Sequence, residues 1–300
     1  MILDSKVSIE PKVSVGVPVF NGEEYLRRRL DSILGQTFTD YEIIISDNAS
    51  TDMTNKICKE YLNKDKRIRY VRQNTNIGFP NNFNFLINEA RGEYYIAAAH
   101  DDLWEPTFLE KNVKVLDTQK NIVGSISKVD FFGYEKQPKI NPYIASLKKM
   151  VRKQDSEPLY NHVLSVSGDY ERKARLYLRF NQGSFVYGLF RTEKIRRKLL
   201  EPNIIASDLV FILNILKDGD LFVIDEILMK KFVGGLSSKG VFDEYKRGEF
   251  PFWDLILPSS SLALWCIRNI GMKFYFKNLD WFILLALYGW RAILLETVRK

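Results

Sequence analysis

Two adjacent aspartates, Asp101 and Asp102, follow a run of apolar residues in the segment YYIAAAHDDLWEP. Neighbouring carboxylates repel each other, and the repulsion is costly unless a cation or a solvated loop offsets it. The pair therefore marks either a site for a positively charged group or an exposed turn that binds nothing. The secondary-structure elements on either side of the pair help to distinguish these two possibilities.

Those elements follow a regular order. Residues 1–120 alternate between strand and helix patterns, as in an α/β fold with a mainly parallel central sheet. Short apolar, β-branched runs predict strands, and apolar residues at helical spacing predict the helices between them. The predicted strands are 12–20, 41–47, 68–73 and 93–99. The predicted helices are 21–36, 50–64, 81–92 and 106–119.

Local signals set the helix ends. Asn21 is placed as the N-cap of the first helix, with Glu24 three residues on as its reciprocal partner. Gly35 is placed to stop that helix. Pro106 suits the first turn of the helix after the aspartate pair.

The second half of the chain is less regular. We predict strands at 122–133 and 184–191, helices at 168–180 and 207–219, the latter closed by Gly219, and one or two strands over 220–233. The Gly/Ser-rich stretch 234–240 is the best candidate domain boundary. It separates an α/β domain over 1–233, with halves 1–130 and 131–233, from a C-terminal helical region over 241–300.

The C-terminal region is amphipathic. Its longest uncharged run, Trp281 to Trp290, has ten residues, whereas about 20 are needed to span a bilayer. Aromatic and basic side chains suit a helix lying in the lipid headgroup zone; they are Trp265, Trp281, Trp290, Lys273, Lys277, Arg291, Arg299 and Lys300. The alternative is a helical hairpin packed on the rest of the chain or on a partner subunit.

Four polar stretches follow successive predicted strands: PVFNGEE, SDNASTD, RQNTNIGFPNN and HDD. The carboxyl ends of parallel strands line one crevice, which is where ligands bind in open α/β sheets. The chain has neither a G-x-G-x-x-G fingerprint nor a Walker A loop. Dinucleotide redox chemistry and P-loop phosphoryl transfer therefore lose their main support.

The segments VSVGVPVFNGEEYLRRRLDSILGQTFTDYEIIISDNASTD and NTNIGFPNNFNFLINEARGEYYIAAAHDD resemble the nucleotide-binding half of the family 2 glycosyltransferases. The resemblance is close over about the first 130 residues and looser over GSFVYGLFRTEKI and SDLVFILNILKDG. It implies the GT-A fold, a Rossmann-like mainly parallel sheet flanked by helices. It also implies a nucleotide-diphosphate sugar donor, usually with Mg²⁺ or Mn²⁺, and inversion at the anomeric centre.

The resemblance also assigns residues on the nucleotide side. Asp47 matches the acidic position that bonds the nucleobase; the alternative is an aspartate that only orders its turn. Asn76 and Gly78 fit the family's loop before the third helix and Asn84 matches a family helix asparagine, and all three are as readily structural. The other matched nucleotide-binding residues are Pro18, Phe20, Asn21, Glu23 and Asp101.

The HDD segment matches the family's metal-binding D-x-D position. Asp101 and Asp102 align with its final acidic residues, His100 fills the variable slot and Ala99 replaces the first aspartate. We therefore expect Mn²⁺ or Mg²⁺ at His100, Asp101 and Asp102, because oxygen-rich sites suit these ions. The alternative is that Asp102 only caps the following helix.

Asp208 matches the family's catalytic base, with Ser207 where a glutamate often stands. An inverting transfer needs a base to deprotonate the acceptor hydroxyl. The alternative is an N-cap role for Ser207 or Asp208. His162 is expected to be a surface residue of the variable basic region.

The net charge is +7, and the excess is concentrated between residues 134 and 200. Lys148, Lys149, Arg152 and Lys153 fall where the family binds its acceptor, so a lipid-linked diphosphate, an anionic glycan or an anionic membrane are the expected partners. Nucleic acid is not expected, because the basic residues form no recognised module. The sequence leaves open whether the chain forms a homo-oligomer.

The sequence carries few indications of the cellular compartment. Cys58 and Cys266 lie far apart with no metal-ligand spacing, which favours a reducing compartment. The N-terminus lacks a secretory pattern. We expect a cytoplasmic enzyme on the inner face of the cell membrane, transferring sugar to a cell-surface glycan or glycolipid. The alternatives are a nucleotide-sugar-binding or membrane-docking protein without catalysis, and a sugar-phosphate nucleotidylyltransferase.

Overall fold

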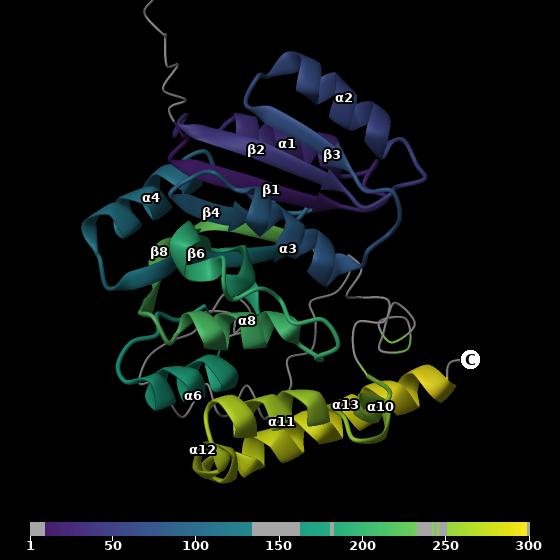
Figure 1. Cartoon of the computed structure of the whole chain (residues 1–300), viewed down its shortest axis with the longest axis vertical. Coiled ribbons are helices and arrows are strands. Elements are labelled where there is room, and N and C mark those ends of the chain that lie inside the picture. The colour runs from purple at the N-terminus through teal and green to yellow at the C-terminus, as the bar shows by residue number, and fades with distance from the viewer. Residues whose placement is uncertain are drawn as a thin grey trace, which may run out of the picture.

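The computed structural model describes residues 10–133, 163–180, 183–232, 242, 245 and 251–298. One eight-stranded sheet runs through the α/β part in the order β3-β2-β1-β4-β7-β6-β8-β5 (Figure 1). Helices flank it, as expected for a GT-A-like α/β fold.

The first four strands form a parallel unit: β1 (Val13–Val19), β2 (Tyr41–Asp47), β3 (Ile68–Arg72) and β4 (Tyr94–Ala97). Every residue of β1, β2 and β4 is buried, because helices cover both faces of a parallel sheet. In register, Val19 at the end of β1 stands beside Asp47 at the end of β2, and Asp47 stands beside Arg72 at the end of β3. The predicted convergence of strand ends at one edge is therefore confirmed.

The rest of the sheet is mixed. The short strand β7 (Leu189–Arg191) runs antiparallel to both β4 and β6 (Ile122–Phe132). β8 (Asp220–Phe232) is parallel to β6, and the two-residue strand β5 (Leu103–Trp104) pairs antiparallel with β8. β5 was not predicted; it places the aspartate pair beside the end of β8.

Helices α1 (Leu26–Leu34), α2 (Thr54–Lys64), α3 (Phe79–Glu89) and α4 (Phe108–Thr118) connect the strands in the predicted order. α6 (Tyr170–Phe180), the one-turn α7 (Thr192–Ile195) and α8 (Ser207–Ile215) belong to the second half. α8 is apolar all round, and Val210 to Leu213 are fully buried. A helix with that pattern belongs inside a core, between the sheet and another helical layer.

Several predicted ends are wrong. α1 begins at Leu26, with Tyr25 at its N-cap and no side-chain capping bond, so Asn21 does not cap it. Gly35 does end it. Only the last three residues of the predicted strand 184–191 form a strand, since Ser184–Tyr187 forms a 3₁₀ turn. α8 ends before Leu216, not at Gly219.

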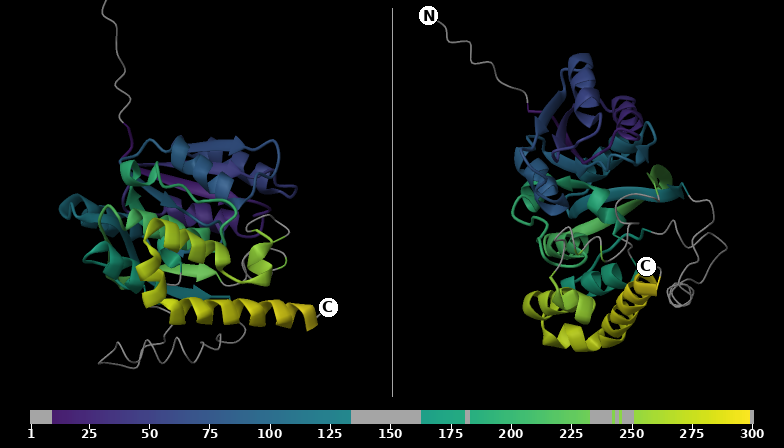
Figure 2. Two further views of the ribbon diagram at one scale, coloured as in Figure 1. Left: turned by 60° about the horizontal axis from the view of Figure 1, so that its bottom comes forward. Right: turned by 90° about the vertical axis from the view of Figure 1, so that its right-hand side faces the viewer.

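The C-terminal helices are α10 (Trp253–Ile256), α11 (Ser260–Asn269), α12 (Met272–Lys277) and α13 (Leu279–Val298). Both figures place them at the end of the molecule opposite α2, next to α6 (Figures 1 and 2). No helix among the described residues has the length and apolarity to cross a bilayer.

One side of this layer packs on the α/β part. The Trp265 indole N–H donates to Glu201 at 3.0 Å, and Arg179 pairs with Asp280 at 2.7 Å. Trp265 is 5% exposed, so its predicted place in a lipid-facing aromatic set is wrong. Within the chain, the packed-hairpin alternative accounts for this side of the layer.

Candidate functional site

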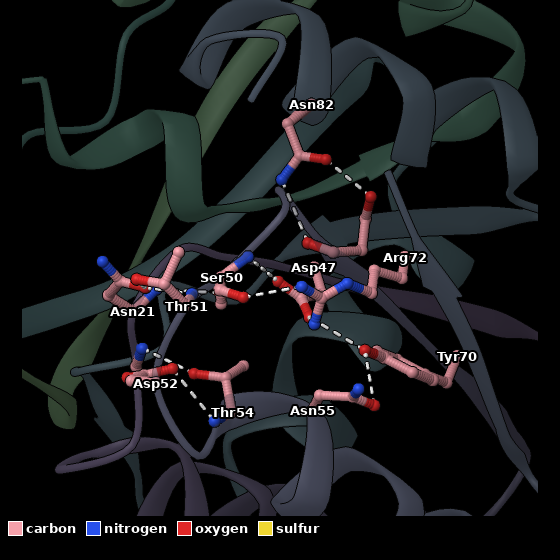
Figure 3. A network of polar contacts seen from close by, with 12 residues as sticks. Asn21, Asp47, Ser50, Thr51, Asp52, Thr54, Asn55, Tyr70, Arg72 and Asn82 are labelled. Carbon is pink, nitrogen blue, oxygen red and sulfur yellow. Dashed lines mark hydrogen bonds and ion pairs between the residues drawn. The ribbon is translucent and has the colours of Figure 1, made fainter. Parts of the chain in front are cut away.

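The loops that follow β1 and β2 are held together by hydrogen bonds between their backbones and side chains (Figure 3). The Asn21 side-chain oxygen accepts from the Thr51 backbone N–H at 2.8 Å, and the Asn21 N–H donates to the Ser50 hydroxyl at 2.9 Å. Glu23 accepts from the Met53 N–H at 2.9 Å, while its own N–H donates to Asp52 at 3.0 Å. Asn21, with φ of 50°, therefore fastens one loop to another instead of starting a helix.

Two other predicted residues of this loop sit nearer the core. Pro18 lies inside β1, buried and in register with Ser46, and Phe20 is half-buried just after the strand. They place the backbone of the first loop at the edge of the sheet.

Asp47 ends β2 with its side chain fully buried. One carboxylate oxygen accepts from the Ser50 N–H at 2.8 Å, and the other accepts from the Tyr70 hydroxyl at 2.8 Å and from Arg72 at 3.2 Å (Figure 3). The contact with Ser50 is the turn-ordering role that the sequence offered as the alternative. The nucleobase contact stays a prediction.

The third loop is tied to the second through Asn48. Its side-chain nitrogen donates to Asn76 at 2.8 Å and its oxygen accepts from the Ile77 N–H at 2.9 Å. Asn76 also accepts from the N–H of Gly78, whose φ of 80° turns the chain into α3. Sequence reasoning missed Asn48, although it lies next to Asp47 in the quoted segment.

Asn84 is bonded to the second half of the chain. Its amide exchanges two hydrogen bonds of 2.8 Å with the backbone of Leu200. This reciprocal pairing joins α3 to the segment before α8, and it accounts for both ends of the amide. The structural alternative for Asn84 is therefore supported by a specific contact.

The aspartate pair lies where β4 gives way to β5. Asp102 is 2% exposed; one oxygen accepts from the Phe232 N–H of β8 at 3.0 Å, and the other has no partner among the described residues. Burial raises the pKa of Asp102 to about 6, and nearby Asp101 adds to the rise. Asp101 is half-buried and makes no hydrogen bond or ion pair within the described part of the chain.

Asp102 caps no helix, since α4 has Thr107 at its N-cap and begins two residues after Pro106. His100 packs at the first loop, where a Cβ added to Gly22 would lie 3.1 Å from its ring. Burial lowers the pKa of His100, which favours the neutral imidazole. The described residues bring no three His, Cys, Asp or Glu side chains into one metal-binding group.

The predicted Mn²⁺ or Mg²⁺ nevertheless fits two of the three residues. The unpartnered buried oxygen of Asp102 and the unengaged carboxylate of Asp101 are hard oxygen donors, the type that both ions prefer. Asp101 and Asp102 would supply the protein's ligands, and the remaining ligands would come from the donor and water.

A fully buried arginine supports the aspartate pair. Arg29 of α1 stacks on the Trp104 ring at 3.8 Å and donates to the Asp102 backbone carbonyl at 3.3 Å. Two of its nitrogens have no partner in the described structure, and burial lowers its pKa to about 10. The sequence showed Arg29 only as one of three consecutive arginines on a helix, with no signal to separate it from the others.

Asp208 lies in the first turn of α8, half-buried. The N-cap is Ala206, with φ of 58° and no capping side chain, so neither Ser207 nor Asp208 takes the N-cap position. Burial raises the pKa of Asp208, while the Leu209 N–H and the charge of Lys231 oppose the rise. A Cβ on Gly183, which has φ of 72°, would lie 2.5 Å from an oxygen of Asp208, so the carboxylate would have to shift.

Tyr187 and Lys231 connect the two acidic positions. The Lys231 Nζ lies 4.6 Å from the centre of the Tyr187 ring. The charge of Lys231 lowers the pKa of both Asp102 and Asp208, and Tyr187 is influenced by both of these carboxylates. The fold thus brings together the loop between β4 and β5, the 3₁₀ turn of Ser184–Tyr187, the end of β8 and the start of α8. Sequence reasoning missed both Tyr187 and Lys231.

Other predictions fall outside the described residues. The basic cluster Lys148, Lys149, Arg152 and Lys153, His162 and the boundary stretch 234–240 all lie in parts of the chain that the structure does not describe. Their expected roles stay predictions.

Comparison with known proteins gives matches of three kinds. The family model "Glycosyl transferase family 2" matches residues 14–176. The glycosyltransferase GlyA of Streptococcus pneumoniae is 37% identical over 115 residues, 38% of this chain and 16% of GlyA. The putative glycosyltransferase EpsE of Bacillus subtilis is 36% identical over 118 residues, 38% of this chain and 42% of EpsE. The aligned part thus spans less than half of either relative.

Two solved structures share the fold. TarS of S. aureus, residues 1–349 in complex with UDP-GlcNAc, matches with a TM-score of 0.56 and 18% identity over 91% of this chain and 79% of that one. The mannosyltransferase PcManGT of Pyrobaculum calidifontis, in complex with GDP-Man and Mn²⁺, matches with a TM-score of 0.58 and 17% identity over 94% of this chain and 74% of that one. At these identities the likeness shows the fold.

Proposed function

The chain belongs to glycosyl transferase family 2, and from this premise we propose that it transfers a sugar from a nucleotide-diphosphate donor to a glycan or lipid-linked acceptor. The observation that carries the proposal is the meeting of the Asp101–Asp102 pair with Asp208 around Tyr187 and Lys231. An acidic pair suited to a diphosphate-bound cation and a separate, half-buried carboxylate are what a single-displacement transfer requires.

The donor nucleoside would lie over the linked strand-end loops. We favour a UDP-sugar, bound by the loop of Pro18, Phe20, Asn21 and Glu23 and by the corner of Asp47. Asp47 already accepts three bonds from protein groups, so a uracil N–H would take the remaining acceptor position of the carboxylate or replace Tyr70 or Arg72 as a donor. Asn76 and Gly78 would border the same corner through their bonds with Asn48 and each other.

The diphosphate would lie at Asp101 and Asp102. A bound Mn²⁺ or Mg²⁺ there acts as a Lewis acid that takes up negative charge on the leaving diphosphate. TarS was solved with UDP-GlcNAc and PcManGT with GDP-Man and Mn²⁺, so ligands of both nucleobases occur on this fold.

Asp208 would act as the base. The acceptor oxygen forms its bond to the anomeric carbon as the bond from that carbon to the diphosphate breaks. The electron pair of the broken bond stays on the leaving phosphate oxygen, and the acceptor proton passes to Asp208. The raised pKa brings Asp208 closer to the range in which a carboxylate takes up a proton effectively.

Donor turnover tests this proposal. We expect release of UDP from UDP-sugars, or of GDP from GDP-sugars, in the presence of Mn²⁺, and its loss in Asp101→Asn. Asp225→Asn is the matched control, because Asp225 is a surface aspartate of β8 with a side chain 87% exposed. Turnover that is equal in Asp101→Asn, Asp225→Asn and the wild type would contradict the site.

The C-terminal helices suit attachment to an anionic membrane surface, where lipid-linked acceptors are found. Twelve of the seventeen exposed large hydrophobic side chains in the described chain lie between Phe252 and Leu295. On α13, Ile283, Leu287, Trp290 and Leu294 recur at helical spacing and are exposed, and Arg291 is exposed beside them. Such an apolar stripe with a cation fits a lipid interface.

Vesicle cosedimentation tests this attachment. We expect the wild type to bind vesicles containing phosphatidylglycerol, and the double variant Ile283→Glu/Leu287→Glu to bind several-fold less. Met53→Glu/Leu62→Glu changes two exposed apolar residues at α2, at the other end of the molecule, and is expected to bind as the wild type does. Equal binding by all three proteins, or none by the wild type, rules out this surface.

A further inference from the structure

Lys231 stands opposite the aspartate pair because of the pairing between β5 and β8. In that antiparallel ladder Trp104 faces Met229 and Leu103 faces Lys230. The next step of the register puts Asp102 beside Lys231, and the Asp102 carboxylate does accept from the adjacent Phe232 N–H at 3.0 Å. The backbone that carries Lys231 is therefore fixed to the pair.

The two neighbouring lysines of β8 face opposite ways, as side chains alternate along a strand. Lys230 is exposed and pairs with Glu105 at 2.8 Å. Lys231 is half-buried, with its Nζ 4.6 Å from the centre of the Tyr187 ring. Only Lys231 points toward the site.

Lys231 has acidic neighbours but no ion pair. Among the described residues no carboxylate lies within ion-pair distance of its Nζ, although Asp102 and Asp208 are both close enough to respond to its charge. Arg29, the other cation near the pair, is fully buried and stacked on Trp104, so it does not reach a ligand. Lys231 is thus the cation of the described site that has donors available for an incoming anion.

We propose that Lys231 binds the diphosphate of the donor and remains bound to the leaving nucleoside diphosphate. This inference rests on the proposed transferase function and adds to it a second positive group, on the β8 side. As the bond between the anomeric carbon and the phosphate oxygen breaks, that oxygen gains negative charge. The Lys231 ammonium donates hydrogen bonds to it, while Tyr187 keeps the ammonium in place through its ring.

Nucleotide binding by paired variants tests this role. The Kd of UDP, GDP, UMP and GMP is measured by calorimetry with Mn²⁺ for the wild type, Lys231→Met and Lys230→Met. We expect Lys231→Met to raise the Kd of the preferred nucleoside diphosphate about tenfold, which corresponds to the loss of one charge-assisted hydrogen bond. The Kd of the monophosphate is expected to rise less than twofold. Lys230→Met is expected to bind both as the wild type does, and Lys231→Arg to recover most of the diphosphate affinity.

Each outcome has a separate meaning. If the wild type binds a nucleoside diphosphate and Lys231→Met binds it equally well, the role of Lys231 is overturned and the proposed function stands. The role of Lys231 is also overturned if Lys231→Met weakens binding of the monophosphate as much as binding of the diphosphate, since Lys231 would then act through the fold. If the wild type binds neither UDP nor GDP, both proposals fail. Melting temperatures of the variants show whether each one is folded.

Discussion

The corner of the sheet at the end of β2 and the corner at the end of β4 both carry buried carboxylates, but those carboxylates have different partners. Asp47 accepts three hydrogen bonds from Ser50, Tyr70 and Arg72, all from its own chain. Asp102 is as deeply buried, yet one of its oxygens has no partner in the described structure, and Asp101 beside it has none.

Under the proposed function, we attribute this difference to ligand binding at the β4 corner. A buried carboxylate oxygen without a partner is costly, and a bound cation would offset that cost. At the β2 corner the protein's own donors already bind the Asp47 carboxylate and tie the loops together, and the proposed nucleobase contact would add to these bonds or replace one of them. At the β4 corner, we propose that the donor diphosphate and its cation engage the unpartnered oxygen of Asp102 and the Asp101 carboxylate.

We expect the largest effect on kcat from a substitution at Asp208, the proposed base. Asp208→Asn keeps the size of the side chain but removes the base, so we expect kcat to fall about a thousandfold with donor Kd nearly unchanged. Steady-state kinetics and calorimetry measure the two quantities. A fall of less than tenfold would place the base elsewhere.

Truncating one carboxylate at each corner tests directly whether the two corners differ in their contribution to stability. Asp47→Ala leaves the Ser50, Tyr70 and Arg72 donors without an acceptor, and we expect the free energy of unfolding to fall by about 3 kcal/mol. Asp101→Ala removes a carboxylate that nothing in the described chain engages, and a change of less than about 0.5 kcal/mol is expected. Urea denaturation measures both; equal losses would erase the distinction between the corners.

Gly183 lies against the Asp208 carboxylate at the start of α8. Gly183→Ala places a Cβ where 2.5 Å separates it from an oxygen of Asp208, and it strains a backbone with φ of 72°. We expect kcat to fall about tenfold as the carboxylate is displaced. Gly271→Ala is the control, since Gly271 also has positive φ but has open space at its Cβ. Loss of activity in both variants would point to backbone strain instead.

The smallest effect is a shift in pH dependence. Asp208 must be ionised to accept a proton, and burial raises its pKa above the ordinary 3.8. Activity should therefore rise with pH through a pKa higher than that of a free aspartate. Leu209 N–H and Lys231 oppose the rise, and Tyr177 and Tyr187 face the same carboxylate. A kcat profile that is flat above pH 4 would contradict this environment.

Sequence patterns predicted the parallel half of the fold well because its strands and helices are set by local periodicity. β2 was predicted to the residue, and Gly35 ends α1 as expected. The Asn21 cap failed because its oxygen bonds Thr51, thirty residues away in the chain, and a tertiary contact replaced the local one. The strand predicted at 184–191 failed for a similar reason, since only its last three residues find partners in β4 and β6.

The site could be predicted only in part. Asp101, Asp102 and Asp208 were identifiable because they resemble known motifs. Arg29, Tyr187 and Lys231 were not, because each is an ordinary residue until pairing and packing bring it to the aspartate pair. The two-residue strand β5 has no periodicity to read, yet it is what sets Lys231 opposite Asp102.

A crystal grown with Mn²⁺ and UDP or GDP would show whether the aspartate pair binds the donor, because Mn²⁺ is located by its anomalous scattering. We expect manganese on the Asp101–Asp102 pair with the diphosphate between it and Lys231, and we expect Asp47 still to accept its hydrogen bond from the Ser50 N–H. Manganese and diphosphate bound together elsewhere, with both aspartates unchanged, would contradict this expectation.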